Sequence, residues 1–316
     1  MRGSTMMTKP DLFPVVGIAG CGLIGISWAG LFLASGHDVI AWDPAAPARD
    51  RFADGVARVV EQLDAIGHPE QKEKGHLSVA GNLRDVASAA SLIQENAPEN
   101  VPLKRALYAE IESVAADHLV ICSSTSSLVW SELSIGMKRP ERLITAHPFN
   151  PPHLMPLVEI FGPDTALLTR VAEFYRSLGR VPVMLKKEAV GHIANRLASA
   201  LWREAVNIVA EGIADVPEVD AALVNGPGLR WSVVGAHMAY HLGGGPGGID
   251  HYLKHLGPSQ ERRWATLGSP SLTPEVCAKL VDGIRQESQG LSVAELELRR
   301  DRGLIAVLGA RQKAET

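Results

Sequence analysis

A histidine and a glutamate in the middle of the chain have the spacing of an acid–base pair. His147 stands in the segment TAHPFNPP, and Glu159 follows twelve residues later in the apolar segment LVEI. A carboxylate among apolar neighbours needs a polar partner, and Glu159 can approach His147 if the chain doubles back between them. An imidazole with a pKa near neutrality can take the proton of a secondary alcohol, while a carboxylate on its other nitrogen fixes the tautomer. The pair predicts a general base for alcohol oxidation.

A run of hydroxyl side chains, SSTSS at residues 123–127, follows an expected strand at residues 119–123. Hydroxyls at the carboxyl end of a strand in a parallel sheet face the ligand crevice. Ser126 is therefore a candidate donor to the substrate oxygen. Helix capping is the alternative role for any one of these serines, and Ser127 is the candidate for it.

The segment GCGLIG at residues 20–25 fits the pattern of a phosphate-binding turn, because it follows an expected strand and opens an expected helix. Gly20 permits the tight turn, Gly22 lets the backbone approach a pyrophosphate, and Gly25 lets the helix pack closely on the strand. Leu23 and Ile24 complete the turn, at the helix amino end where unpaired N–H groups bind phosphate.

Asp43 ends the second expected strand, 23 residues after Gly20, where an acidic residue binds the ribose hydroxyls. A carboxylate there repels a 2′-phosphate, so the sequence favours NAD over NADP as the cofactor. Arg49 and Arg51 lie close enough along the chain to reach back, which keeps NADP open.

These residues need a sheet to position them, and the first half of the chain alternates strand and helix patterns. Strands are expected at residues 15–19, 38–42, 77–80, 91–94, 119–123, 143–146, 157–160 and 181–185. Helices are expected between them at residues 24–35, 48–66, 83–89, 103–115 and 165–178. After residue 193 the patterns are helical only, at residues 194–211, 216–224, 234–241, 249–256, 274–289 and 293–304. The sequence predicts an α/β fold: a Rossmann-type doubly wound parallel sheet (residues 11–189) followed by an all-α domain (residues 190–316).

Composition excludes several other classes of protein. The chain has 316 residues, 46% of them hydrophobic, with 31 Lys and Arg against 35 Asp and Glu. This charge of −4 excludes a polybasic nucleic-acid binder, and the apolar content excludes general disorder. Three separated cysteines without a CxxC pair suit a reducing compartment. Residues 1–10 lack the apolar core of a signal peptide, so we expect a cytoplasmic protein.

The motifs GCGLIG, Asp43, TSSL, HPFNPP, LVE and KEAVGHIANRL, in this order, resemble the 3-hydroxyacyl-CoA dehydrogenase superfamily from about residue 15 to about residue 264. The resemblance implies NAD as cofactor and a helical domain that forms a homodimer. It also implies roles for His147 as base, Glu159 as its partner, Ser126, Asn150 and Asn195 as substrate-side residues, and Glu95 as a cofactor-side residue. The alternative for Glu95 is a solvated loop carboxylate.

Two departures from the acyl-CoA pattern bear on the substrate. HPFNP stands where acyl-CoA members usually have HFFNP, and the segment GPGLRW at residues 226–231 also differs. Both features look more like the branch of L-gulonate 3-dehydrogenase (λ-crystallin) and L-carnitine dehydrogenase, which implies a free 3-hydroxy acid as substrate. A free carboxylate needs a cationic partner, and Arg230, in a loop shaped by Gly226 and Gly228, is the candidate. The alternative role for Arg230 is an ion pair at the surface or at a dimer interface.

Carnitine would also need aromatic rings for its quaternary ammonium. Candidates cluster in the helical domain, where ordinary packing is the alternative role, at Trp231, Tyr240, Tyr252 and Trp264. The histidine pairs 237/241 and 251/255 have metal-ligand spacing, but hydride transfer to NAD needs no metal, so none is expected. The glycine tract at residues 243–248 is expected to be a flexible connector.

The sequence thus predicts an NAD-dependent dehydrogenase that oxidises the 3-hydroxyl of a small free acid resembling L-gulonate or L-carnitine. A 3-hydroxyacyl-CoA dehydrogenase is the first alternative. A non-catalytic, crystallin-like NAD-binding protein is the second. No nucleic-acid or membrane partner is expected.

Overall fold

The computed structural model describes residues 12–68 and 74–315, and the chain divides into two compact units, Met1–Asn195 and Arg196–Thr316. Residues 1–10, on which the expectation about a signal peptide rested, lie outside the described residues. Within the described ranges, no helix combines the length and the apolar character needed to span a membrane.

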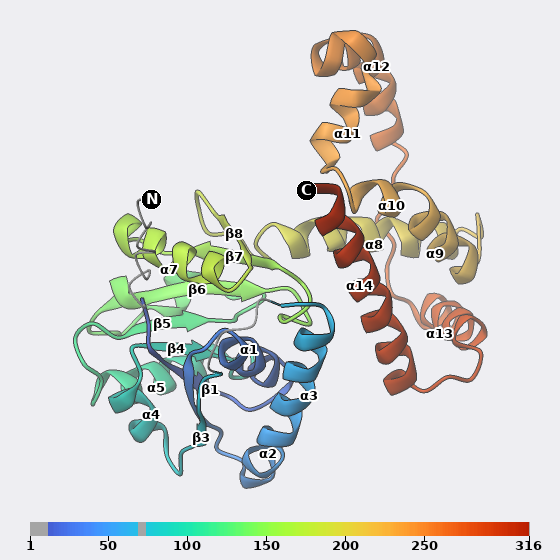
Figure 1. The fold of residues 1–316 in the computed structure, drawn as a ribbon. Coiled ribbons are helices and arrows are strands. Elements are labelled where there is room, and N and C mark those ends of the chain that lie inside the picture. The colour runs from blue at the N-terminus through green and yellow to red at the C-terminus, as the bar shows by residue number, and fades with distance from the viewer. Residues whose placement is uncertain (1–11, 69–73, 316) are drawn as a thin grey trace, which may run out of the picture. The chain divides into compact units, whose positions relative to one another are not determined.

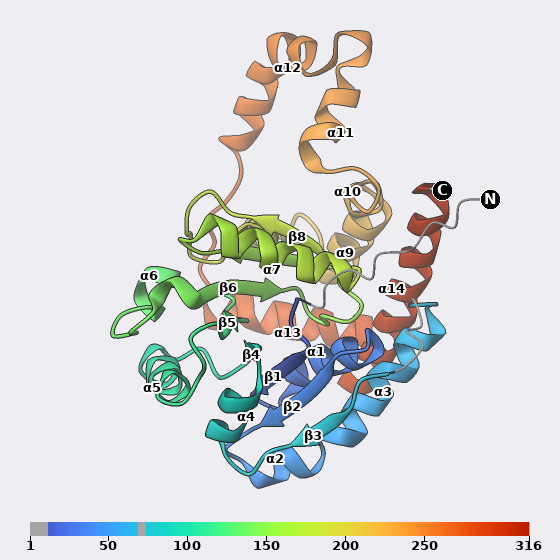
Figure 2. The ribbon, with the colours of Figure 1, turned by 60° about the vertical axis from the view of Figure 1, so that its left-hand side comes forward.

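The first unit is built on one sheet of eight strands in the order β3-β2-β1-β4-β5-β6-β7-β8 (Figures 1 and 2). The strands are β1 (Val15–Ala19), β2 (Asp38–Trp42), β3 (Leu77–Val79), β4 (Leu92–Glu95), β5 (Val120–Ser123), β6 (Leu143–Pro148), β7 (Leu157–Phe161) and β8 (Val181–Met184). The strands β1 to β6 run parallel, whereas β7 runs antiparallel to β6. The connection between β6 and β7 is too short for a parallel crossover, so the chain must reverse there.

Helices cover both faces of the sheet: α1 (Leu23–Ala34), α2 (Ala46–Asp50), α3 (Phe52–Ala65), α4 (Leu83–Ala89), α5 (Val101–Glu112), α6 (Trp130–Leu133) and α7 (Thr165–Ser177). One core joins the sheet to α1, α3 and α7, and Trp28 stacks there on Phe32 at 5.5 Å between ring centroids. The other core joins the opposite face to α4 and α5 around Val86 and Tyr108. The Rossmann-type fold expected from the sequence is confirmed.

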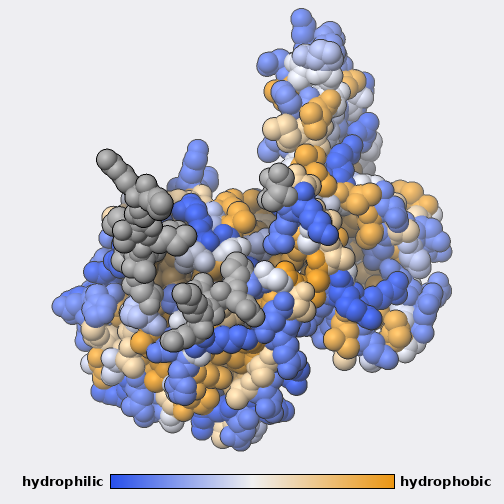
Figure 3. Space-filling model, viewed as in Figure 1, coloured by the Kyte–Doolittle hydropathy of each residue, from blue (hydrophilic) through white to orange (hydrophobic). Residues whose placement is uncertain are grey.

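The second unit is helical, and no strand follows β8 in the described residues, which confirms the all-α carboxyl-terminal domain. Its helices are α8 (Ala194–Ala210), which begins at the end of the first unit, α9 (Val216–Asn225), α10 (Pro227–Trp231), α11 (Ala236–Gly243), α12 (Gly248–Trp264), α13 (Pro274–Ser288) and α14 (Val293–Glu315). Within this unit α9 packs against α10 and α13, and α11 packs against α12. Figure 3 shows apolar side chains at the surface of these helices.

One expectation about the helical unit needs correction. Arg230 lies on the short helix α10 rather than in a loop, because Pro227 opens a helical turn and the Arg230 N–H bonds to the Gly226 carbonyl. The glycine tract connects two helices, as expected, and includes a 3-10 turn, Gly245–Gly247, between α11 and α12.

Candidate active site

The reversal between β6 and β7 sets His147 directly opposite Glu159 in the antiparallel register. Their side chains meet with 2.8 Å between Nδ1 of His147 and Oε2 of Glu159. The imidazole is almost fully buried, and the carboxylate is completely so. The other ring nitrogen, Nε2, has no hydrogen-bond partner among the described residues and belongs to a side chain that lines a hollow.

Glu159 is held in its ionised form by three hydrogen bonds. Burial alone would raise its pKa, but the hydrogen bond from His147 and those from the amides of Ala194 and Ile193 outweigh burial and lower the pKa. The two amides donate to Oε1 at 3.0 and 2.7 Å. An ionised Glu159 accepts the proton on Nδ1, which leaves Nε2 as the basic nitrogen of this ring.

A second carboxylate, Glu99, holds the serine-rich turn after β5. Its Oε1 accepts hydrogen bonds from the Ser126 hydroxyl at 2.8 Å and from the Ser127 amide at 3.1 Å. Thr125 donates its hydroxyl to the same carboxylate. Burial raises the pKa of Glu99, yet these hydrogen bonds and the nearby Lys104 lower it overall, so the group is an anion at the edge of the hollow.

The segment that opens α8 closes another side of the site. Asn195 donates its side-chain amide to the Ser126 carbonyl at 3.1 Å. His192 is buried, donates from Nε2 to the Thr125 carbonyl at 3.0 Å, and lies 5.1 Å from the His147 ring. Burial lowers the pKa of His192, so this second imidazole stays neutral beside the first.

These groups surround one hollow of about 400 Å³ in the first unit. It is lined by Ile24, Asn96, Ala97, Pro98, Glu99, Ser124, Ser126, His147, Pro148, Phe149, Asn150 and Asn195. The structure therefore brings together His147, Glu159, Ser126, Asn150 and Asn195 of the predicted residues. Glu99 and His192 were missed, although Glu99 directly precedes Asn100, which caps α5 at the carboxyl edge of the sheet.

Glu95 does not reach this hollow. It is the last residue of β4, fully buried, and its carboxylate accepts from Lys104, Tyr108 and Ser123 at 2.6 Å each. Its oxygens are committed to partners inside the domain, so neither the cofactor-side role nor the solvated alternative fits its surroundings. Glu99, four residues later, is the carboxylate at the site.

The glycine-rich turn fits a dinucleotide. A Cβ at Gly25 would lie 1.9 Å from the Gly20 carbonyl oxygen, and Gly20 itself has φ +105°, so a side chain is excluded at both positions. A Cβ at Gly22 would meet nothing within 4 Å. No side chain caps the amino end of α1, at Leu23 and Ile24, so its N–H groups are available to a phosphate.

Asp43 stands at the end of β2, beside this turn. Its Oδ2 accepts the Cys21 amide at 2.8 Å and its Oδ1 accepts the Ala45 amide at 2.9 Å, so each oxygen keeps a lone pair for a ribose hydroxyl. Arg49 reaches back, but it bonds to the carbonyls of Asp43 and Pro44 rather than to the carboxylate. Burial, helped by the charge of Asp43, raises the pKa of the Cys21 thiol to about 12.

The remaining predicted residues lie in the helical unit. Arg230 is exposed on α10, and no ion pair involving it is present in the described residues. Tyr240 and Tyr252 pack ring to ring at 5.1 Å. Tyr240 is nevertheless exposed, as are Trp231 and Trp264. His251 and His255 have their rings 4.3 Å apart, but no set of three or more metal-binding side chains occurs in the described parts of the chain.

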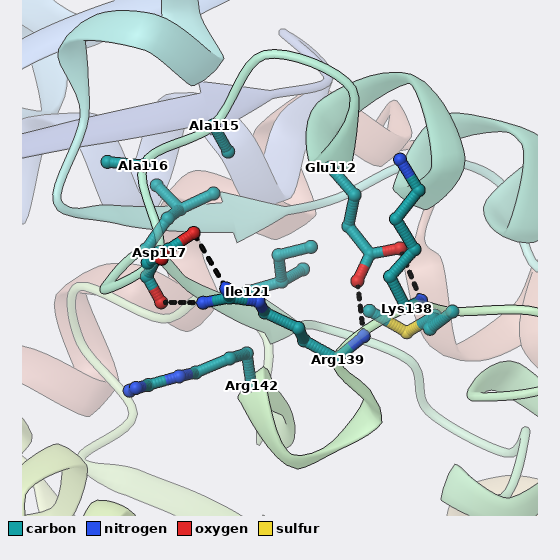
Figure 4. Close-up of a pocket in the computed structure, with 10 residues that line it drawn as sticks. Glu112, Ala115, Ala116, Asp117, Ile121, Lys138, Arg139 and Arg142 are labelled. Atoms are coloured by element: carbon teal, nitrogen blue, oxygen red, sulfur yellow. Dashed lines mark hydrogen bonds and ion pairs between the residues drawn. The ribbon is translucent and has the colours of Figure 1, made fainter.

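A second hollow lies at the amino ends of β5 and β6, at the opposite edge of the sheet (Figure 4). Its acidic groups have partners: Glu112 accepts the backbone amides of Lys138 and Arg139, and Asp117 pairs with Arg139 at 2.7 Å. Nε of Arg142 is buried without a hydrogen-bond partner among the described residues. Ligands of doubly wound sheets bind outside the carboxyl ends of the strands, so we place the active site in the first hollow.

Comparisons with known proteins identify the family of the chain. Residues 15–189 match the model for the 3-hydroxyacyl-CoA dehydrogenase NAD binding domain, and residues 191–269 match that family's C-terminal domain. The chain is 40% identical to an L-carnitine dehydrogenase of Nocardiopsis dassonvillei over 98% of this chain and 94% of that protein. The L-carnitine dehydrogenase of Streptomyces coelicolor is 39% identical over 96% of both chains.

Among solved structures, an NAD+-dependent dismutase, 5-formyl-3-hydroxy-2-methylpyridine 4-carboxylic acid 5-dehydrogenase, superposes with a TM-score of 0.83. It is 25% identical, and the match covers 95% of this chain and 98% of that one. FadB2 of M. tuberculosis matches 69% of this chain and 79% of its own at a TM-score of 0.62 and 27% identity. The chain therefore belongs to the 3-hydroxyacyl-CoA dehydrogenase family of NAD-dependent oxidoreductases.

Proposed function

We propose that this protein oxidises the 3-hydroxyl group of L-carnitine, a free 3-hydroxy acid, to the 3-keto acid. The observation that carries the proposal is the His147–Glu159 pair, whose imidazole lines a hollow at the carboxyl edge of the sheet. The relatives named above supply the choice of carnitine among 3-hydroxy acids.

In this proposal Nε2 of His147 takes the hydroxyl proton of the substrate. Glu159 remains ionised and stabilises the imidazolium that forms. To donate to the reacting oxygen, the Ser126 hydroxyl turns away from Glu99, and Asn195 uses the N–H that does not bond to the Ser126 carbonyl. Asn150 lines the same hollow. When bound, NAD supplies the acceptor for the hydride that leaves the substrate carbon.

Within the proposal, the cofactor is held by residues of the first unit. Gly20, Gly22 and Gly25 shape the turn, the α1 amides bind the pyrophosphate, and Asp43 receives the ribose hydroxyls. We assign this role to residues 11–189 and the substrate and dimer contacts to residues 190–316. In the structure, residues 193–195 are tied to the first unit by their bonds to Glu159 and Ser126.

The lining of the hollow supports a cationic substrate. Glu99 contributes a negative charge, Phe149 contributes an aromatic ring, and no Lys or Arg is among the lining residues described. An anion and a ring face together suit a quaternary ammonium group. Arg230 of the helical unit is the proposed partner of the substrate carboxylate, where a guanidinium can bind both oxygens.

A panel of substrates tests the proposal by the rise of NADH absorbance. We expect L-carnitine to give the highest kcat/KM, with L-gulonate, 3-hydroxybutyrate and 3-hydroxybutyryl-CoA far lower. A higher kcat/KM for the CoA thioester would show that the protein is a 3-hydroxyacyl-CoA dehydrogenase and would overturn the proposal. A higher kcat/KM for gulonate would leave the reaction as proposed but change the substrate from carnitine to gulonate. No turnover on any of the four would favour a non-catalytic NAD-binding protein.

We further propose that the helical unit forms a homodimer with a second copy. It buries few apolar residues, and Figure 3 shows apolar side chains at its surface. The large apolar residues that are exposed include Leu197, Trp202, Val233, Leu253 and Trp264. Apolar surface on this scale is typical of an interface between subunits. Sedimentation of the full chain should give twice the mass of 33.8 kDa; a monomer at micromolar concentration would contradict this.

A further inference from the structure

The segment between β6 and β7, residues 149–156, carries Phe149 and Asn150 into the hollow. It contains no helix or strand of its own, and Pro151 and Pro152 lack backbone donors. Two backbone hydrogen bonds lie within it, from the amides of Leu154 and Met155 to the Pro151 carbonyl. Two buried side chains anchor it to the rest of the unit: Arg180 from outside the segment, and His153 of the segment itself.

Arg180 lies between α7 and β8, and only 8% of its surface is exposed. Its Nη1 donates to the carbonyls of Pro152, His153 and Met155 at 2.9, 3.2 and 3.4 Å. Its Nε donates to Leu178 at 3.3 Å. No described carboxylate forms an ion pair with it, and burial lowers the pKa of this guanidinium to about 10. Burying a cation without a nearby anion costs free energy of desolvation. The Arg180 guanidinium is buried in this way and binds three carbonyls of one segment.

His153 fixes the same segment to the dinucleotide-binding helix. Its amide donates to the Ser27 hydroxyl at 2.9 Å, and its Nδ1 lies 2.7 Å from the same oxygen. Its Nε2 lies 2.8 Å from Oε1 of Gln62 on α3. Since an amide oxygen only accepts, Nε2 carries a proton and the Ser27 hydroxyl can donate to Nδ1. Both Ser27 and His153 are buried.

We propose that Arg180 is a positioning residue for the reaction, because it holds the segment 149–156 that presents Phe149 and Asn150 to the substrate, with Ser27 and His153 as a second anchor. The expected effect on kcat and KM rests on the proposed function. The claim that Arg180 holds the segment in place does not, and it can be tested without a substrate.

The kinetic test compares Arg180→Met, Arg180→Lys and Arg176→Met with wild type on L-carnitine. Arg176 is exposed on α7 and serves as the matched control. We expect Arg180→Met to lower kcat/KM about 10- to 100-fold through both kcat and KM, because misplacement by about 1 Å has effects of this size. Arg180→Lys should recover part of the loss, since an ammonium group can still donate to these carbonyls. Arg176→Met should match wild type.

Hydrogen exchange of the amides of His153, Leu154 and Met155 supplies a readout that needs no substrate. In folded Arg180→Met these amides should exchange faster than in wild type. Unchanged exchange, or faster exchange with wild-type kcat and KM, would overturn the proposal. If wild type oxidises no 3-hydroxy acid, the proposed function fails while the exchange result still decides whether Arg180 holds the segment.

Arg180→Met removes a buried group and can fail to fold, so Ser27→Ala tests the second anchor independently. It should speed exchange at the His153 amide and raise KM less than Arg180→Met would. Wild-type exchange and wild-type KM in Ser27→Ala would also overturn the proposal.

Discussion

His147→Gln is expected to lower kcat by about 10²- to 10⁴-fold, the range that a general base contributes. Glutamine can still donate a hydrogen bond to Glu159, but it offers the substrate no basic nitrogen. Turnover is followed by NADH absorbance at saturating substrate, and NADH binding is followed by fluorescence titration. Binding should remain at the wild-type level because His147 lies outside the glycine-rich turn.

His118→Gln is the matched control, since this histidine is exposed and remote from the hollow's lining. It should leave turnover unchanged. Near-normal turnover in His147→Gln would remove this residue as the base and leave the His147–Glu159 pair as a structural contact.

Gly25→Ala is expected to destabilise the first unit by about 1–3 kcal/mol and to abolish measurable NAD binding, because an added methyl must displace the start of α1. Its Cβ would lie 1.9 Å from a backbone oxygen, which no side-chain rotation can relieve. Urea unfolding measures the stability and NADH fluorescence measures the binding. Wild-type affinity in Gly25→Ala would show that the turn does not hold the cofactor.

Gly22→Ala separates the two effects of the turn. The space around its Cβ is open, so we expect unchanged stability with weakened NAD binding. Unchanged NAD binding in Gly22→Ala would show that the pyrophosphate does not lie against Gly22. The two glycines thus distinguish a role in folding from a role in contact with the ligand.

The sheet and the meeting of His147 with Glu159 could be predicted from the sequence for a local reason. A proline-rich connection of eight residues, 149–156, leaves no room for a crossover helix, so the next strand returns antiparallel. In such a return, residues at equal distances from the turn face each other. The register of His147 with Glu159 follows from this symmetry.

The choice between Glu95 and Glu99 could not be made in this way. The strand β4 is buried on both faces, so its pattern does not show which way a glutamate points. Glu95 turns inward because Lys104 and Tyr108 of α5 and Ser123 of β5 meet it there. Contacts between separate elements therefore decide which glutamate points to the hollow, and the periodicity of one strand does not reveal such contacts.

In the helical unit, too, local features could be predicted from the sequence and contacts between elements could not. Amphipathic periodicity predicts six of its helices, and the structure forms all six, but α12 and α14 continue to Trp264 and Glu315, well beyond the expected ends at residues 256 and 304. The short helix α10 was not expected. Arg230 lies on a helix because Pro227 occupies its first position, which favours a helix. The neighbouring Gly226 and Gly228 favour a loop in the sequence pattern, so the helix was not expected. In the proposed dimer, the exposed apolar side chains pack against a second copy of the chain, and the pattern of one sequence does not show which residues would meet across that interface.

The burial of two of the three cysteines determines how the protein can be labelled. Cys21 and Cys122 are buried, and burial raises the pKa of each thiol to about 12, so neither supplies a thiolate at neutral pH. Cys277 on α13 is exposed. Maleimide dyes should therefore attach at one place per subunit, on the helical unit and far in sequence from the glycine-rich turn. A fluorescent reporter can be placed there without mutagenesis.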